Sequence, residues 1–540
     1  MPELHSKKSN HLLLQASIVI FIFLLGAKIL NFFKKILIGH LFGVSSVADA
    51  FFAASYVPYY VAVFFEGVVF LVFLPLFSEI KTQKGDREAG QFAGQIFFIL
   101  LALTGGIVLF SWGMAPWMMN ELVPGFTLEE QALTVSLFRM MSWLVMFISL
   151  CSFFRALNSY FEKYAVAASS GFLDTAVMIL ITLMTWKLWG VYGAAWGSVI
   201  GAALAFAIQL LYLFPFFRIR ITFAGFRWDW LRKVLVFFIP LAVIWAFQQI
   251  PLILINRFGS GMWEGTISAL VIAQTLTTVP MGLVSHTVLL SVFPSLTKQW
   301  RSDAQDRASV MFFETLRIAF FVLIPLGFLI SALGRPLAVF FFGNGEVNAE
   351  STERIGNALG CFGWGIFALY ADLFMTQSLI AVRRVAPAVI LCASRALLTY
   401  AFAYFLSGVW DYMGLALSFS LALAFNLFFL FPLFLQGTPF RGEWHKTWIY
   451  SGKLFLASVP AIIAGWVIFT GPVQTWFELS RVLLLAVSVF LALVLTGFYI
   501  FILSLLRVEE VQSLFDKAKR KWQERGLFVA RPEDEVSTIV

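Results

Sequence analysis

Three lysines and an asparagine stand in one of the most apolar stretches of this chain, GAKILNFFKKILIGHLFGVSSVADAFF at residues 26–52. Lys28, Asn31 and Lys35 follow one another at helical spacing and share one helix face, and Lys34 lies beside it. A cation in the middle of a bilayer costs roughly 2.5–3.5 kcal/mol without a partner. This face is therefore expected to contact a partner or a water-filled cavity.

Another interpretation stays open for two of the lysines. Lys34 and Lys35 stand near the end of the apolar run, where a lysine can reach the lipid headgroups by snorkelling.

Asp49, at the start of the next apolar run, either caps that helix or takes part in function. Glu66, between VFF and GVVF, needs a cation or a proton. Asp49 and Glu66 are the candidates for ion coupling or for pairing with the lysines.

Two further carboxylates in apolar segments are expected to be structural: Asp174 and Asp372. Helix-breaking residues that a moving transporter could use as bends or gates are Pro58, Gly67 and Pro280.

The composition predicts a polytopic membrane protein. Of the 540 residues 60% are hydrophobic and only 13% are charged, and the mean hydropathy is +0.87. The net charge of +8 comes from basic residues between apolar runs and does not indicate nucleic acid. The three cysteines stand in apolar segments, so neither disulfides nor a thiolate metal site is expected.

Apolar runs long enough to cross a core of about 30 Å predict an all-α protein with about 14 transmembrane helices. These runs lie at 12–38, 47–79, 90–114, 131–158, 164–187, 191–217, 233–256, 265–296, 309–334, 355–382, 387–408, 412–435, 450–470 and 478–507. Basic residues gather in alternate loops, Arg155 being assigned to one of them, while the opposite loop at 120–130 is acidic. The positive-inside rule then places both termini in the cytoplasm.

An internal repeat divides the chain. Four short matches recur in the same order at an offset of 219 to 222 residues, among them YVPYY at 56–60 with TVPMG at 278–282. Six helices separate the copies, which predicts two lobes related by an axis along the membrane normal. The predicted parts are an N-lobe (1–217), a C-lobe (218–435), two added helices (436–507) and a cytoplasmic amphipathic tail (508–540). A solute site between the lobes and alternating access follow from this plan.

Enzyme signatures are not found: the sequence has no G-x-S-x-G elbow, P-loop or H-E-x-x-H motif, and its five histidines are scattered. We expect no enzyme, no metal and no cofactor, although a membrane enzyme with an unfamiliar site stays open. Without a nucleotide-binding fold, transport must draw on the membrane potential or on an ion gradient of unknown ion.

Several blocks resemble the lipid II flippase family, MurJ/MviN, of the multidrug/oligosaccharidyl-lipid/polysaccharide exporter superfamily. The match begins with LFG…ADAFFAA…VP…EG…F.P.FSE across 41–79 and continues with ALNSYFEKYAVAA at 156–168, VYGAAWGSVIGAAL at 191–204 and PMGLVSHTVLLSVFPSLTK at 280–298. The resemblance implies a central cationic cavity for the headgroup of an undecaprenyl-pyrophosphate-linked saccharide, and a lipid groove along the two added helices. Lys28 and Lys34 match helix positions where the family has cavity-facing arginines, and Asp49 matches its aspartate in DAFF.

The chain departs from the family pattern at three places. Lys35 stands where the family has an acid, YYVAVFF at 59–65 lacks the family's basic pair, and Gln274 and Thr275 replace an Asp-Arg pair. The expected substrate-binding set is Lys28, Asn31, Lys34, Lys35, Gln274 and Thr275.

The resemblance implies a flippase that moves lipid II from the inner to the outer leaflet of the bacterial cytoplasmic membrane. Membrane lipids and cell-wall synthesis proteins are the expected partners. Two alternatives stay open: a flippase for another polyprenyl-pyrophosphate-linked glycan, and a membrane scaffold without transport activity.

Overall fold

The computed structural model describes residues 2–213, 226–301, 305–342, 347–382, 384–434, 441–470, 481–506, 508 and 512. Helices make up nearly all of this part of the chain, and it contains no strand. The N-terminal half holds α1 (Pro2–Phe42), α2 (Ser46–Val68), the π-helical η1 (Val69–Phe73), α3 (Leu74–Leu122), α4 (Leu128–Met141), α5 (Trp143–Tyr160), α6 (Tyr164–Trp189) and α7 (Val191–Leu213).

The C-terminal half begins with α8 (Trp228–Gly259), α9 (Thr266–Ser291), α10 (Phe293–Arg301), α11 (Gln305–Ala332), α12 (Gly334–Phe342), α13 (Ala349–Gly363) and α14 (Ile366–Ala381). It ends with α15 (Val385–Phe425), the π-helical η3 (Asn426–Leu430), α16 (Phe431–Phe434), α17 (Arg441–Thr470) and α18 (Arg481–Leu505). The short α12 and the two π-helical segments were not predicted. The predicted C-terminal tail lies outside the described residues, apart from 508 and 512.

Two continuous helical stretches each turn back on themselves. Ser46–Leu122 has 77 residues, about 115 Å at helical rise, which is far longer than one span needs. The Ser46 amide binds Glu264 and the Gly125 amide binds Ser260, so both ends of the stretch lie at one end of the molecule. The turn is at Gly85, whose φ of 81° favours glycine.

The stretch from α15 to η3 turns in the same way. Asn426 Nδ2 donates to the Leu391 carbonyl at 2.9 Å, so residues 35 positions apart lie side by side. The reversal is at Trp410 and Asp411, where the backbone is non-helical. Within the described residues, eight helical stretches are long and apolar enough to span a membrane, and a ninth forms if the bent α13–α14 pair is one span. The predicted count of fourteen therefore stays a prediction.

The helix bounds repeat at the offset seen in the sequence. Adding 221 to the bounds of α4 gives 349–362, which is α13 to within one residue, and the same shift places α5 on α14 and α2 on α9. The two arms of the α15 stretch correspond in the same way to α6 and α7. Each predicted lobe boundary (217, 435 and 507) falls within or beside residues that the structure does not describe, so the exact division stays a prediction.

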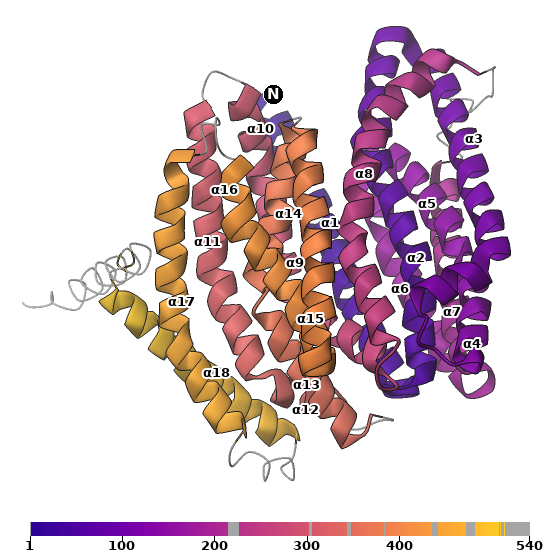
Figure 1. Cartoon of the computed structure of the whole chain (residues 1–540). Coiled ribbons are helices and arrows are strands. Elements are labelled where there is room, and N and C mark those ends of the chain that lie inside the picture. The colour runs from indigo at the N-terminus through magenta and orange to yellow at the C-terminus, as the bar shows by residue number, and fades with distance from the viewer. Residues whose placement is uncertain are drawn as a thin grey trace, which may run out of the picture.

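The helices form two groups. Figure 1 shows α2 to α7 on one side and α11 and α14 to α17 on the other, with α18 at the outer edge of the second group. Phenylalanine-rich cores fill both groups: Phe73, Phe77, Phe92 and Phe153 in the first, and Phe312, Phe313, Phe320 and Phe374 in the second. Helix α1 packs mainly on α6 and also contacts α9, while α8 packs mainly on α15 and also contacts α2. These two helices therefore connect the groups.

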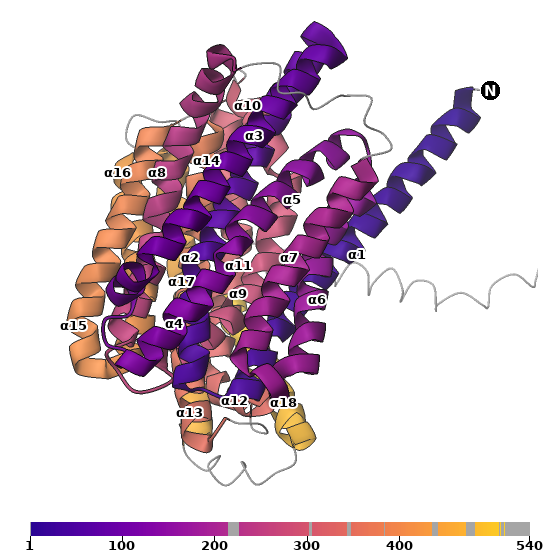
Figure 2. The ribbon, with the colours of Figure 1, turned by 90° about the vertical axis from the view of Figure 1, so that its right-hand side faces the viewer.

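The basic loops lie at one end of the molecule. Lys81 stacks on Phe161, Arg227 pairs with Glu88, and Arg384 lies over Trp300. The start of α1 lies at the same end as α10 (Figures 1 and 2). Arg155 does not belong to a loop as predicted: it lies inside α5, where its guanidinium pairs with Glu66. The assignments of Lys81, Arg227 and Arg384 to loops at one end agree with these contacts, and the other assignments stay predictions.

The opposite end holds the two groups together. Arg257 pairs with Glu121 at 3.0 Å, and the Ser46 amide donates to Glu264 at 3.0 Å. The Gly125 amide donates to the Ser260 hydroxyl at 3.2 Å. These contacts join the α1–α2 and α3–α4 turns to the α8–α9 turn, so the molecule is closed at this end.

Candidate functional site

A cavity of about 640 Å³ lies between the two groups of helices. Helices α1, α2, α4 to α9 and α13 contribute its walls. All six predicted substrate-binding residues line it: Lys28, Asn31, Lys34, Lys35, Gln274 and Thr275. The helical spacing on α1 thus brings the lysines to one wall, and their roles in binding stay predictions.

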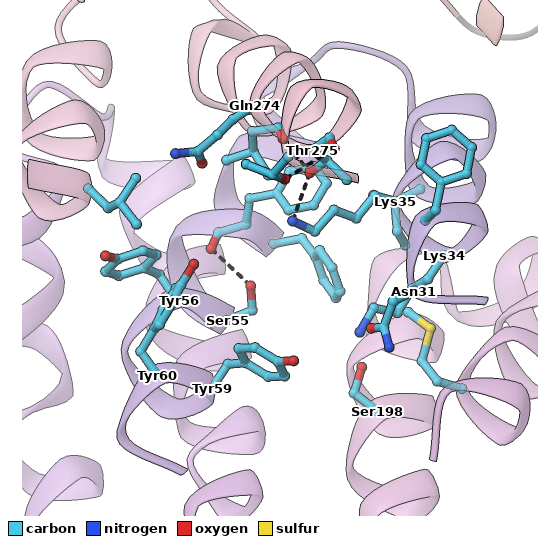
Figure 3. A pocket seen from close by; sticks show the side chains of 18 of the residues that line it. Asn31, Lys34, Lys35, Ser55, Tyr56, Tyr59, Tyr60, Ser198, Gln274 and Thr275 are labelled. Atoms are coloured by element: carbon cyan, nitrogen blue, oxygen red, sulfur yellow. Dashed lines mark hydrogen bonds between the residues drawn. The ribbon is translucent and has the colours of Figure 1, made fainter. Parts of the chain in front are cut away.

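Lys35 points into the cavity from α1 (Figure 3), and Lys28 and Lys34 line the same wall. Lys35 Nζ donates to the Thr275 hydroxyl of α9 at 2.8 Å, and Lys34 Nζ lies 5.6 Å from the centroid of the Tyr59 ring. Lys28 is exposed and its ammonium lies close to Gly282. Lys34 and Lys35 thus do not reach along α1 to its end, as snorkelling would require.

The cavity is cationic. Among its lining residues are three lysines and a single carboxylate, Asp174. No ion pair within 4 Å is formed by Lys28, Lys34 or Lys35 in the described part of the chain. Ammonium groups without carboxylate partners in a low-dielectric site attract an anion, and a phosphate or diphosphate suits such a group of point charges.

The wall opposite the lysines is made of tyrosines and amides. Tyr56, Tyr59 and Tyr60 project from α2, with Gln274 above them (Figure 3). The Tyr56 hydroxyl donates to the Gln249 carbonyl at 3.1 Å. In the sequence, residues 59–65 were notable only because they lack the basic pair found in the family that the chain resembles. Rings and amides of this kind can pack against and hydrogen-bond a sugar.

The two carboxylates predicted for ion coupling do not line this cavity. Asp49 accepts from the backbone amides of Gly265 and Ser268, at 3.0 and 2.6 Å. It therefore caps α9 across the helix groups, whereas α2 is capped by Ser45, so the alternative that Asp49 caps its own helix is wrong. A cap accounts for its burial without any role in transport.

Glu66 lines a smaller space of about 180 Å³ next to the cavity, which we call the side chamber. Its walls come from α1, α2, α5, α6 and α7, and Glu66 pairs there with Arg155. Sequence reasoning missed Arg155 as a site residue because it counted the residue as part of a loop. A basic residue three positions before the end of the apolar run 131–158 could not have been told from a loop residue by composition alone.

The predicted bends are continuous helix. Pro58 lies inside α2 and Pro280 inside α9, and no break is seen at either. Gly67 comes just before η1, and a Cβ added to it would meet nothing within 4 Å. A role of these residues in gating stays a prediction.

Comparison with known proteins identifies the family. A sequence profile described as "Lipid II flippase MurJ" matches residues 38–498. A relative named "Probable lipid II flippase MurJ" from Buchnera aphidicola subsp. Schizaphis graminum is 24% identical over 421 residues, which is 76% of this chain and 80% of that protein. The profile match begins at residue 38, so it does not include Lys28, Lys34 or Lys35.

Solved structures share the fold. "Lipid II flippase MurJ, inward closed conformation" superposes with a TM-score of 0.72 at 20% identity, covering 92% of this chain and all of that one. An inward-facing multidrug resistance MATE family transporter of the MOP superfamily gives a TM-score of 0.62 at 14% identity, covering 81% and 95%. Because the profile covers far more than half of the chain, this protein belongs to the lipid II flippase MurJ family.

Proposed function

We propose that this protein moves lipid II from the inner to the outer leaflet of the bacterial cytoplasmic membrane by alternating access. The observation that carries the proposal is the group of Lys28, Lys34 and Lys35, without carboxylate partners, on the wall of a cavity between the two helix groups. Lipid II presents a diphosphate, which these ammonium groups would bind. Its sugars would lie against the tyrosine and amide wall.

The basic end of the molecule faces the cytoplasm in this proposal, with both termini on that side. The closed end then faces outward, so the structure corresponds to a state that receives substrate from inside. The lipid tail stays in the bilayer along α17 and α18. The membrane potential or an ion gradient drives the cycle, and cell-wall synthesis proteins receive the product.

A second candidate is transport of another polyprenyl-pyrophosphate-linked glycan. Gln274 and Tyr59 support it, because both line the cavity where the resemblance leads one to expect charged residues. The diphosphate would bind as for lipid II, and only the sugar contacts would differ.

Complementation tests the proposal. The wild-type gene should restore growth to a bacterium depleted of its own lipid II flippase, whereas Lys28→Ala and Lys34→Ala should not. Each lost charge-assisted contact removes about 1.5–3 kcal/mol of binding free energy, which is roughly a 10- to 150-fold loss in affinity. Lys187→Ala, a change at a lysine outside the cavity next to Trp186, is the matched control and should grow normally.

The outcomes separate the candidates. A wild-type chain that inserts in the membrane and does not restore growth contradicts lipid II as substrate and favours another glycan. Equal growth of the wild type and both cavity variants contradicts a role of the lysines in transport.

A further inference from the structure

The side chamber lies directly beside the cavity, and one carboxylate lines both. Asn31, Tyr59, Ile148 and Asp174 belong to both sets of lining residues. Asp174 of α6 thus lies on the wall between the cationic cavity and the chamber that holds the Glu66–Arg155 pair.

The two carboxylates of the chamber differ in their partners. Glu66 pairs with Arg155. Asp174 accepts a hydrogen bond only from its neighbour Thr175, at 3.3 Å, and none of the described cations lies within 4 Å of it. Lys34 lines the same cavity, and its ammonium carries the charge opposite to that of the Asp174 carboxylate. A carboxylate in a membrane interior needs such a counter-charge.

The internal repeat shows what a permanently paired version of this position looks like. Arg395 stands 221 positions after Asp174, and Asp372 stands 221 positions after Cys151. In the C-terminal half these two form an ion pair with both side chains buried. In the N-terminal half the equivalent of Asp372 is a thiol, and Asp174 carries the charge opposite to that of Arg395, so this ion pair is not repeated. Because no described cation lies within 4 Å of it, Asp174 has no fixed ion-pair partner in this structure.

A second counter-charge is available in the chamber. The Nε of Arg155 is buried and has no hydrogen-bond partner among the described residues. Its Nη2 binds Glu66, and its Nη1 lies 3.5 Å from the Ser170 hydroxyl. Arg155 and Asp174 both line the side chamber.

We propose that Asp174 is a positioning residue that competes with the substrate diphosphate for Lys34. In the empty cavity its carboxylate offsets part of the charge of Lys34 without forming a direct ion pair, and when the diphosphate binds Lys34, the carboxylate turns to Arg155. When it returns to Lys34 it helps to expel the diphosphate, so affinity is lowered and release is accelerated. This inference rests on the proposed function, because it assumes that the substrate carries a diphosphate.

The test measures affinity and rate separately for the full-length protein in lipid nanodiscs and proteoliposomes. Asp174→Asn should bind lipid II about tenfold more tightly than the wild type and flip it more slowly. Asp174→Glu, which keeps the charge, should restore both values toward the wild type. If Asp174 had only a structural role, its replacement by asparagine would not tighten the binding of lipid II. If Asp174→Asn does not fold, Asp174→Ser serves the same purpose.

A double-mutant cycle shows whether the effect acts through Lys34. In the Lys34→Gln background, Asp174→Asn should leave the affinity unchanged, because there is no ammonium to compete for. Glu129→Gln, an acid-to-amide change at an exposed position of α4, is the matched control and should bind as the wild type does. Unchanged or weaker binding by Asp174→Asn overturns the inference, and so does an equal effect with and without Lys34.

Inorganic pyrophosphate, used as a second probe, separates this inference from the choice of substrate. A wild type that binds pyrophosphate and does not bind lipid II overturns the proposed substrate alone. The pyrophosphate affinities of Asp174→Asn and the wild type are then compared. Tighter binding by the variant supports the inference, and equal binding overturns it.

Discussion

At the scale of single residues, most of the charged side chains discussed for the apolar helices form an ion pair or line the cavity. Asp372 was expected to be structural, and its side chain is buried against Arg395 and Asn426. Arg395 also donates to the Gln248 carbonyl at 3.1 Å, which ties α15 to α8. The partner of Asp372 was not predicted, because the sequence does not tell which helix faces meet.

Removing one member of this pair should destabilise the fold strongly. Arg395→Met leaves the Asp372 carboxylate buried without a cation, a change that costs about 3–5 kcal/mol. The double variant Asp372→Asn with Arg395→Met should recover most of that loss, because no charge stays uncompensated. Thermal unfolding in detergent measures both. A single variant as stable as the wild type contradicts the pairing.

At the scale of elements, glycines decide how closely α7 approaches α6. Gly193, Gly197 and Gly201 recur every four residues on one face of α7, as in close helix pairs of membrane proteins. A Cβ added at Gly197 would lie 3.0 Å from the Met178 carbonyl oxygen of α6. At Gly201 it would meet the Asp174 carbonyl oxygen at still closer range. This packing fixes the backbone that carries Asp174.

Gly201→Ala should therefore separate the two helices. The overpacking costs about 1–3 kcal/mol and shifts Asp174 relative to the cavity. Gly113→Ala is the control, because an added Cβ meets nothing within 4 Å there and alanine favours a helix. Unfolding midpoints of the two variants decide the matter: an equal midpoint for both would contradict the tight α6–α7 contact.

The cap of α9 makes an element-scale prediction of its own. Asp49→Ala removes the acceptor for the Gly265 and Ser268 amides, so stability should fall by about 2 kcal/mol. Asp49→Asn keeps one acceptor oxygen and should lose less. Amide hydrogen exchange at residues 265–268 reports the cap directly. If these amides exchange as slowly in Asp49→Ala as in the wild type, Asp49 does not cap α9.

At the scale of the whole molecule, the sequence predicts the architecture better than the site. Hydropathy locates the helices because each must cover a bilayer's thickness in apolar residues, and the repeat offset reappears in the helix bounds. The face of α1 follows from helical period alone. Contacts between distant segments, such as Asp49 with α9 and Glu66 with Arg155, could not be predicted, because they depend on how helices rotate against one another.

The closed end makes a final prediction about motion. Alternating access requires the contacts between Ser46 and Glu264 to separate in each cycle, because they join the two helix groups. Ser46→Cys with Glu264→Cys, treated with a short cleavable thiol crosslinker, should lose flipping in proteoliposomes and regain it on reduction. Ser136→Cys with Tyr192→Cys is the control: these residues lie at the same end, but both belong to the N-terminal group, and their hydroxyls are 2.9 Å apart. Crosslinking there should leave flipping unchanged. Undiminished flipping by the crosslinked Ser46–Glu264 pair would show that this end does not open during transport.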